Sequence, residues 1–221
     1  MKKFAIIVAG GQGIRMQGTL PKQFLPLRDE PVLAHTLRRF DLPDIQILLV
    51  MNAAYLAYWK DLSATIKELP AHTVVPGGST RALSVLNGLM SIEGDGLVAV
   101  HDAVRPLCSK ALIQHLFQEA GEHGSAIPVV PVKDTLRLIT PEGSTTVSRD
   151  LYRAVQTPQV FHLEQLRKAF NREDASAFTD EASLYQAAGH TIHLCEGEEE
   201  NLKITVPADL VAAASLLDKY R

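Results

Sequence analysis

The chain has very little cysteine, no surplus of positive charge and no long apolar run. Its 221 residues include two cysteines, Cys108 and Cys195, and neither lies in a CxxC pattern. This scarcity argues against a disulfide framework or a zinc site and favours a reducing cytoplasm. Lysine and arginine number 22 against 25 aspartates and glutamates, which argues against binding to a nucleic-acid backbone. Since no apolar run approaches the ~18 residues that span a membrane, we expect no membrane partner.

The remaining composition is that of a soluble globular protein, with 46% hydrophobic and 21% charged residues. The length suits one large domain and no repeat or linker divides it, so we expect a single domain over residues 1–221. Residues 1–9 superficially resemble a signal peptide. Their apolar part is too short for one, and a glycine-rich segment follows in place of a cleavage region. We therefore interpret residues 4–9 as a buried first strand.

Short, nearly continuous runs of Val, Ile and Leu alternate with helical patterns. The strands that we expect are Phe4–Ala9, Ile45–Met51, Thr73–Val75, Leu97–His101 and Ala126–Val130. We expect four helices: one that begins near Pro31, one over Ala53–Leu69, one after a cap at Ser79 or Thr80, and one over Ser109–His123. In the third, Leu83, Leu86 and Met90 are expected to face inward. Runs that are apolar on both faces suit strands of a parallel sheet. The pattern predicts a doubly wound, mainly parallel α/β sheet.

Two stretches interrupt this alternation, residues 10–30 and residues 131–155. Residues 132–155 contain two polar runs on either side of Pro141-Glu142-Gly143, which predicts a β-hairpin inserted into the domain. A hairpin with so little apolar content is not stable alone. We therefore expect this arm, residues 132–155, to lean on another surface, such as that of a second subunit.

A long glycine-containing loop follows the first strand and carries Arg15 and Lys22. The dinucleotide-binding fingerprint fails because Met16 stands where a glycine belongs, and the P-loop fails because Thr19 replaces its lysine. Glycines let backbone N–H groups approach a phosphate, and an Arg and a Lys at the carboxyl edge of a sheet suit a polyphosphate. A glycine-rich turn with solvated cations is the open alternative at this point.

Two later strand ends carry similar groups. Gly77-Gly78 lie shortly before Arg81 at a helix start, which indicates an anion or base-edge site or, equally, a simple helix cap. Asp102 follows a strand and can hold Mg²⁺ or a sugar hydroxyl, or can pair with Arg105 to order its loop. Lys203 follows an acidic run and lies just inside an expected strand.

Nine motifs run through essentially the whole chain. In order they are Ala9-Gly10-Gly11-x-Gly13-x-Arg15-Met16, Pro21-Lys22-Gln23-Phe24, Gly77-Gly78-x-x-Arg81-x-x-Ser84, His101-Asp102-Ala103-Val104-Arg105-Pro106, Pro131-Val132-Lys133-Asp134-Thr135, Arg149, Gln156-Thr157-Pro158-Gln159, Thr179-Asp180-Glu181-Ala182 and Asn201-Leu202-Lys203-Ile204-Thr205. Each motif is weak alone. Together, and in this order, they resemble the 2-C-methyl-D-erythritol 4-phosphate cytidylyltransferase family of the non-mevalonate isoprenoid pathway.

The resemblance implies that the chain transfers a cytidylyl group from CTP to the sugar-alcohol phosphate, with Mg²⁺ as cofactor and pyrophosphate as second product. It implies catalytic roles for Arg15, Lys22, Arg149 and Lys203. It implies CTP binding by Ala9, Gly10, Gly11, Gly13, Gly78, Ser84 and Asp102, and substrate binding by Arg105, Thr135, Arg149, Thr157 and Thr179. The metal ligands stay undetermined: Asp102 is the candidate, and the CTP phosphates are expected to supply most of the contacts. Because Thr135 and Arg149 match residues that reach a neighbouring active site, the arm implies a homodimer.

Three other interpretations remain. Ribitol 5-phosphate cytidylyltransferase resembles the chain at Pro21-Lys22-Gln23-Phe24 and at residues 101–106, although residues 131–137 favour the methylerythritol enzyme. A non-catalytic nucleotide-binding protein on the same scaffold is opposed by the presence of Arg15, Lys22 and Lys203 together. A nicotinamide oxidoreductase is the least supported, because the dinucleotide-binding fingerprint is absent.

Overall fold

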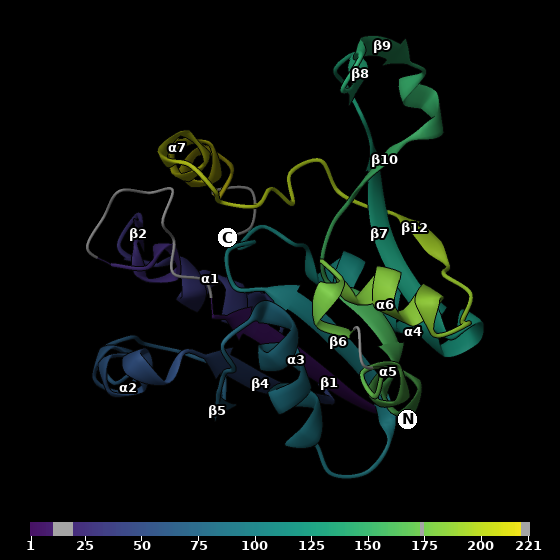
Figure 1. The fold of residues 1–221 in the computed structure, drawn as a ribbon. Helices are drawn as coiled ribbons and strands as arrows, with labels where there is room; N and C mark the ends of the chain where they lie inside the picture. The colour runs from purple at the N-terminus through teal and green to yellow at the C-terminus, as the bar shows by residue number, and fades with distance from the viewer. Residues whose placement is uncertain (11–19, 173–174, 218–221) are drawn as a thin grey trace.

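A computed structural model describes residues 1–10, 20–172 and 175–217 of the chain (Figure 1). In this part of the chain the central sheet has the strand order β10-β7-β11-β6-β1-β4-β5, with β12 beside β7. Its strands are β1 (Lys2–Ala9), β4 (Ile45–Met51), β5 (His72–Pro76), β6 (Gly96–Asp102), β7 (Ser125–Pro131), β10 (Arg153–Val155), β11 (Gln159–His162) and β12 (Leu194–Glu196). β1 runs parallel to β4 and β6, and β4 runs parallel to β5, while β11 is antiparallel to β6 and β7. The predicted mainly parallel α/β sheet is confirmed.

Helices cover both faces of this sheet. They are α1 (Val32–Arg39), α2 (Leu56–Ser63), α3 (Arg81–Met90), α4 (Lys110–His123), α5 (Leu163–Ala169), α6 (Glu181–Ala187) and α7 (Pro207–Leu216). Short 3-10 turns lie at Lys22–Phe24, Ala53–Tyr55, Arg149–Leu151 and Ala175–Ala177, and β2 (Pro26–Leu27) pairs with β3 (Glu30–Pro31). None of the helices in the described part of the chain is long and apolar enough to cross a membrane.

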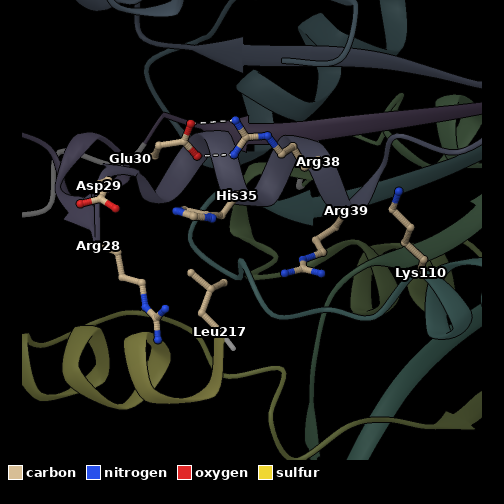
Figure 2. Close-up of a pocket in the computed structure, with 8 residues that line it drawn as sticks. All are labelled: Arg28, Asp29, Glu30, His35, Arg38, Arg39, Lys110 and Leu217. Carbon is tan, nitrogen blue, oxygen red and sulfur yellow. Dashed lines mark hydrogen bonds and ion pairs between the residues drawn. The ribbon is translucent and has the colours of Figure 1, made fainter. Parts of the chain in front are cut away.

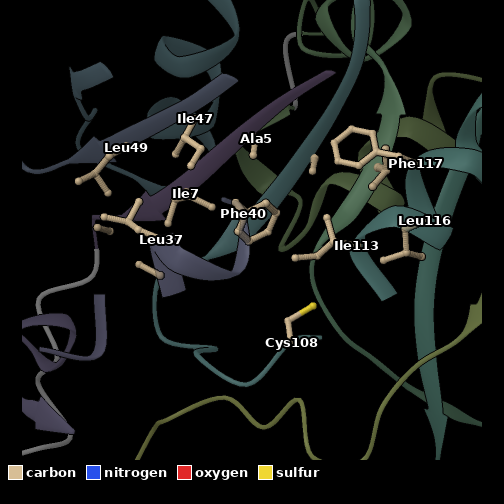
Figure 3. Close-up of a cluster of buried hydrophobic side chains, with 14 of the residues drawn as sticks. Ala5, Ile7, Leu37, Phe40, Ile47, Leu49, Cys108, Ile113, Leu116 and Phe117 are labelled. Atoms are coloured by element: carbon tan, nitrogen blue, oxygen red, sulfur yellow. The ribbon is translucent and has the colours of Figure 1, made fainter. Parts of the chain in front are cut away.

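Alternate residues of β1 enter two different cores. Ala5 and Ile7 point to the face covered by α1, α2 and α4, where Figure 3 shows them near side chains such as Phe40. Phe4 and Ile6 point to the other face, which α3, α5 and α6 cover. This two-residue alternation explains why β1 is apolar from Phe4 onward: both of its faces are buried there.

The helix predicted over Ala53–Leu69 is shorter than expected. It divides into the 3-10 turn at Ala53–Tyr55 and α2, and ordinary helix ends at Ser63. The hydroxyl of Thr65 donates to the carbonyl oxygen of Leu62 at 2.7 Å, a local bond that competes with helix continuation. Glu68 then adopts a left-handed φ of 53°, which is incompatible with a helix.

The inward face predicted for α3 is wrong at Leu83 and Met90, whereas Leu86 is partly buried against the core. Leu83 and Met90 are 40% and 69% exposed, whereas Val85 and Leu89 are fully buried. The buried face is centred on Gly88, where an added Cβ would lie 3.0 Å from side chains of β1 and β4. The missing side chain lets α3 approach the sheet closely, and this contact decides the orientation that the spacing of leucines alone does not.

The arm contains the predicted hairpin. β8 (Leu136–Thr140) pairs antiparallel with β9 (Gly143–Val147), and the turn falls at Pro141-Glu142, within the expected Pro141-Glu142-Gly143. Gly143 has a φ of 145°, a conformation that residues with a Cβ rarely adopt. Figure 1 shows the hairpin at the far end of the extension formed by β7 and β10, well away from β1, β4 and β5.

Candidate active site

A cavity of about 580 Å³ lies at the carboxyl ends of the parallel strands. Its lining comprises Val8, Ala9, Gly10, Lys22, Gln23, Asn52, Gly78, Ser79, Thr80, Arg81, Asp102, Ala103, Val104 and Lys203. All of these residues except Lys203 end or follow β1, β4, β5 and β6, so the parallel topology brings them together from distant parts of the sequence. Lys203 comes from the segment between β12 and α7. We call this the larger cavity.

A second cavity, of about 400 Å³, adjoins the first, and Arg81, Asp102 and Lys203 line both. We call it the smaller cavity. Of the described residues implied in CTP binding, all except Ser84 line the larger cavity: Ala9, Gly10, Gly78 and Asp102. The residues implied in substrate binding that line the smaller one are Arg105, Thr157 and Thr179. Their proximity is a finding, whereas their roles remain predictions.

Asp102 is the centre of the wall that the two cavities share. Its carboxylate lies 2.8 Å from Lys203 Nζ, 3.5 Å from Arg81 Nε and 3.8 Å from Arg105 Nε. Burial alone would raise the pKa of this carboxyl, but the surrounding cations outweigh burial and hold the pKa well below its usual value. Asp102 is therefore ionised at any working pH. Lys203 lies in a segment without regular structure and not in the strand that was expected there.

Arg81 is held from behind by a buried carboxylate. Its Nη1 and Nη2 donate to the two oxygens of Glu181 at 2.6 and 3.0 Å, and Glu181 is only 2% exposed. Burial would lower the pKa of Arg81, but the charges of Glu181 and Asp102 raise it, so the guanidinium stays ionised. This two-pronged pair fixes the guanidinium plane at the shared wall.

Ser84 lies under the glycine turn at the end of β5. Its hydroxyl accepts from the Gly78 N–H at 3.1 Å and donates to the Thr80 carbonyl at 2.8 Å, and the residue is 1% exposed. An added Cβ at Gly77 would lie 2.9 Å from this hydroxyl, and one at Gly78 would lie 2.4 Å from Leu83 Cβ. Ser84 thus supports the turn from below, and it does not line the cavity. Of the two predicted caps of α3, Ser79 and Thr80, the structure shows Thr80, whose hydroxyl accepts from the Leu83 N–H.

A buried hydrogen-bond chain shapes the smaller cavity. Thr157 Oγ1 accepts from the Asp102 N–H and lies 3.1 Å from His101 Nδ1, while the other ring nitrogen of His101 faces the Arg105 carbonyl. Burial lowers the pKa of His101 to about 4, so the imidazole is neutral near pH 7. Arg105 Nη1 donates to the Asn201 carbonyl at 2.6 Å, which joins the strand end to the segment that carries Lys203.

Lys22 and Gln23 occupy the near wall of the larger cavity. Lys22 Nζ donates to the Ile204 carbonyl at 3.0 Å, so Lys22 contacts the segment that carries Lys203. The buried side chain of Gln23 donates to the Ala9 carbonyl at 2.9 Å and fixes the end of β1. Gly11, Gly13 and Arg15, which the resemblance implied in CTP binding and catalysis, lie outside the described residues.

The arm residues do not join either cavity within one chain. Thr135 and Arg149 are exposed and line neither cavity. The Arg149 guanidinium donates to the Lys133 carbonyl within the arm itself. The structure therefore separates these two residues from the other predicted site residues.

A third cavity, of about 480 Å³, lies elsewhere, between α1 and the residue that follows α7 (Figure 2). It has several cations, but they are engaged by the protein. Arg38 pairs with Glu30, Arg39 donates to the Pro106 carbonyl and Lys110 donates to the Asp41 carbonyl. This cavity also lies away from the glycine turn, so we do not assign it to the nucleotide.

Three residues of the site have no assigned role in the sequence reasoning. Arg81 and Glu181 appear in the motifs, yet their pairing across a hundred positions leaves no local pattern to detect. Asn52 lines the larger cavity because it directly follows β4, and its side chain accepts from the Ala54 N–H at 2.9 Å. The same rule that selected Asp102, a polar residue at the end of a parallel strand, would have selected Asn52.

Solved structures share this fold over nearly the full chain. The crystal structure of 2-C-methyl-D-erythritol 4-phosphate cytidylyltransferase from Thermus thermophilus is 33% identical, with a TM-score of 0.79 and coverage of 96% of this chain and 98% of that one. The 4-diphosphocytidyl-2C-methyl-D-erythritol synthase structure from Anaerococcus prevotii is 28% identical, with a TM-score of 0.83 and coverage of 98% and 96%. Fold and site together define the class of the protein as a nucleotidyltransferase.

The family follows from the sequence comparison. The 2-C-methyl-D-erythritol 4-phosphate cytidylyltransferase from Bacteroides thetaiotaomicron is 48% identical over 219 residues, covering 98% of this chain and all of that protein. The family model described as 2-C-methyl-D-erythritol 4-phosphate cytidylyltransferase matches residues 4–219. The chain belongs to this family, which confirms the resemblance seen in the motifs.

Proposed function

We propose that the larger cavity binds CTP and the smaller one binds 2-C-methyl-D-erythritol 4-phosphate. The chain transfers the cytidylyl group of CTP to this substrate, giving 4-diphosphocytidyl-2-C-methyl-D-erythritol and pyrophosphate. A phosphate oxygen of the substrate attacks the α-phosphorus of CTP, the bond from that phosphorus to the bridging oxygen breaks, and pyrophosphate leaves with the electron pair. The observation that carries the assignment of cavities is their shared wall, which contains Arg81, Asp102 and Lys203.

The chemistry requires positioning and positive charge and no protein nucleophile, because the attacking phosphate is already anionic. In this proposal Lys22 and Lys203 hold the phosphates of CTP and stabilise the negative charge that builds up as pyrophosphate leaves. Lys22 donates to the carbonyl of Ile204, the residue that follows Lys203, so the two lysines act from one side of the cavity. The family resemblance gives Arg15 the same role.

The glycine turn at Gly77-Gly78 is the proposed reading surface for cytosine. Its backbone polar groups can pair with the edge of a small base, and the lack of side chains lets the base approach. The Ser84 hydroxyl keeps the Gly78 N–H in place from below. We propose that Ser84 contributes to recognition of CTP through this support.

The Mg²⁺ ion of the family's reaction fits this wall only in part. Among the described residues Asp102 is the one carboxylate that lines the larger cavity, and its oxygens already face cations. Mg²⁺ in proteins is commonly held by one or two carboxylates, with substrate phosphates and water as its other ligands. A single ionised carboxylate is therefore enough to bind it here. We therefore propose that Asp102 and the CTP phosphates hold the ion, which when bound neutralises phosphate charge.

The arm is the proposed dimer contact and the source of the remaining substrate groups. Leu138, Ile139 and Leu151 are 53%, 74% and 84% exposed in the single chain. Apolar side chains in that number on a projecting arm favour a covering partner. In the homodimer Thr135 and Arg149 then reach the partner's smaller cavity. The domain remains a single nucleotidyltransferase unit, with residues 132–155 as its inserted arm.

A cytoplasmic location completes the proposal. Cys108 and Cys195 are both free and buried, which suits a reducing compartment.

The experiment that tests the function is pyrophosphate release from CTP with each of two acceptors, 2-C-methyl-D-erythritol 4-phosphate and ribitol 5-phosphate. The first acceptor is expected to give sustained turnover, and the second little or none. ATP and GTP in place of CTP are expected to fail, because in this proposal the glycine turn reads the edge of a small pyrimidine base. Equal rates with both acceptors, or with ATP and CTP, would refute the assigned specificity. Calorimetry that detects CTP binding without any turnover would instead favour a non-catalytic nucleotide-binding protein.

A further inference from the structure

A cluster of histidines and a glutamate lies outside both cavities, where the end of α4 meets the segment that leads into β12. Glu119 Oε2 is 3.0 Å from His193 Nε2 and 3.6 Å from His123 Nε2. One possible ligand atom from each of these three residues lies within 4.8 Å of the other two. Two ligands at ~2.1 Å from a tetrahedral zinc ion lie about 3.4 Å apart. The distances of 3.0 and 3.6 Å from Glu119 Oε2 to the two imidazole nitrogens lie on either side of this value, and the shorter one is a hydrogen bond in this structure.

The backbone holds these three side chains together without help from a metal. Glu119 and His123 are four residues apart on α4 and therefore lie on one face of that helix. Gly124 turns the chain from α4 into β7 with a left-handed φ of 87°. At the start of β7 the Ser125 hydroxyl accepts from the His193 N–H at 3.1 Å, and the His193 carbonyl accepts from the Ile127 N–H at 2.9 Å. The helix end and the segment before β12 are thus fixed against each other.

The rings of His123 and His193 have to rotate relative to each other before both can bind one ion, because the lone pairs of stacked imidazoles lie in separate, nearly parallel planes. The imidazoles of His123 and His193 stack with centroids 3.9 Å apart and planes 17° apart, and both turn Nε2 toward Glu119. The other carboxylate oxygen of Glu119 lies 3.8 Å from His115 Nδ1, which is too far for a hydrogen bond but places a further imidazole beside the cluster. The side chains of His123 and His193 are 47% and 35% exposed, which leaves room for a water ligand.

We propose that Glu119, His123 and His193 form a binding site for a divalent transition-metal ion, with zinc as the expected occupant. Two imidazole nitrogens and one carboxylate oxygen, with water in the fourth position, are ligands that zinc accepts. The scarcity of cysteine excludes only zinc sites that use thiolate ligands, and this cluster uses none. The bound ion ties the end of α4 to the entry of β12. The strand β12 in turn precedes the segment that carries Lys203.

This site is distinct from the magnesium site proposed at the shared wall. Imidazole ligands favour zinc and its neighbours in the transition series, whereas Mg²⁺ prefers oxygen ligands alone. Millimolar Mg²⁺ should therefore leave zinc binding unchanged. The proposal does not depend on the assigned reaction, because its readouts are binding and stability in the absence of CTP.

The test is isothermal titration of ZnCl₂ into tag-free, full-length protein stripped with a chelator. We expect one zinc ion per chain and a higher melting temperature with zinc than without. His123→Gln and His193→Gln should each weaken zinc binding by about tenfold or more, since loss of even an outer partner typically has that effect. His162→Gln is the matched control: its ring lies 4.0 Å from the Cβ position of Gly124 but outside the cluster, and zinc affinity should be retained.

The two histidine variants also guard against a folding artefact, because they alter different segments and each can be checked by its metal-free melting curve. Titration with CoCl₂ gives a second readout, since the visible spectrum of a tetrahedral cobalt site differs from that of an octahedral one. Absence of zinc binding at micromolar concentration would overturn the proposal. Wild-type zinc affinity in folded His123→Gln and His193→Gln would overturn it as well.

Discussion

The ammonium of Lys203 lies 2.8 Å from the Asp102 carboxylate, although Lys203 belongs to no helix or strand. Asp102 ends β6 and is fixed by the sheet, so the ion pair holds an irregular segment against a rigid edge. Lys22 reinforces this attachment by donating to the carbonyl of the next residue, Ile204. Two cations are thereby held at the larger cavity before any substrate binds, which is the arrangement that electrostatic catalysis requires.

Lys203→Gln is expected to lower kcat by two to three orders of magnitude with a smaller change in KM for CTP. One lost contact to charge that develops in the transition state is worth about 3–4 kcal/mol. The free energy of unfolding should change by no more than about 1 kcal/mol, because the side chain is 41% exposed. Initial rates of pyrophosphate release and urea denaturation measure the two effects. Lys168→Gln, an exposed lysine on α5, is the control and should keep full activity. Near-normal turnover in folded Lys203→Gln would remove this residue from the catalytic set.

The glycine turn gives a graded prediction for CTP recognition. Gly78→Ala introduces a Cβ that would lie 2.4 Å from Leu83 Cβ, so the turn must move and KM for CTP should rise strongly. Ser84→Ala removes the acceptor of the Gly78 N–H together with the donor to the Thr80 carbonyl. Loss of the Gly78 contact is worth about 1 kcal/mol and should raise KM for CTP about fivefold. Ser91→Ala, at the other end of α3, serves as the control and should leave KM unchanged. Steady-state kinetics at saturating acceptor measure all three. Unchanged KM in Gly78→Ala would show that the turn does not meet the base.

His101 predicts how stability depends on pH. Its pKa is about 4 in the folded protein and about 6.5 in the unfolded chain, so between these values only the unfolded state binds the proton. The contribution of His101 to stability is complete above about pH 6.5 and is lost as the pH falls toward 4. The loss from this residue between pH 7 and pH 5 should be about 2 kcal/mol. Urea denaturation at both pH values measures it, with His101→Asn as the non-titrating comparison. An equal loss in the two proteins would assign the pH dependence to other groups.

The arm can be tested by mixing two inactive variants, Lys22→Ala and Arg149→Ala, under conditions that exchange subunits. If Arg149 serves the partner's site, one site of a mixed dimer collects both lesions and the other is intact. Activity should then recover, to at most about half of wild type per mixed dimer if the two sites are independent. If Arg149 serves its own chain, every site carries one lesion and mixing restores nothing. Mass spectrometry under native conditions establishes that mixed dimers have formed, so absence of recovery would exclude the shared site.

Much of the site could be predicted because the positions of the strand ends could be predicted from the sequence. Nearly continuous apolar runs form most of β1, β4 and β6, and parallel pairing gathers the residues that follow these strands and β5 at one edge. Ala9, Gly78 and Asp102 therefore meet although long stretches of sequence separate them. The same reasoning extends to Asn52, which the motif search passed over.

The rest depended on contacts that carry no local signal. The Arg81–Glu181 pair joins α3 to α6, and no periodicity in either helix indicates the other. Lys203 belongs to no helix or strand. Its position depends on the ion pair with Asp102 and on the hydrogen bond from Arg105 to the Asn201 carbonyl, two residues earlier. The orientation of α3 was decided by Gly88, a residue that adds no apolar weight to either face.

The most direct test of the reaction follows the oxygen atoms. The acceptor is 2-C-methyl-D-erythritol 4-phosphate with ¹⁸O in its phosphate, incubated with unlabelled CTP and the wild-type protein, and both products are weighed by mass spectrometry. Attack of the substrate phosphate on the α-phosphorus predicts that all the label stays in the 4-diphosphocytidyl product and that pyrophosphate contains none. Label in the pyrophosphate, or absence of a nucleotide–alditol product, would contradict cytidylyl transfer at this site.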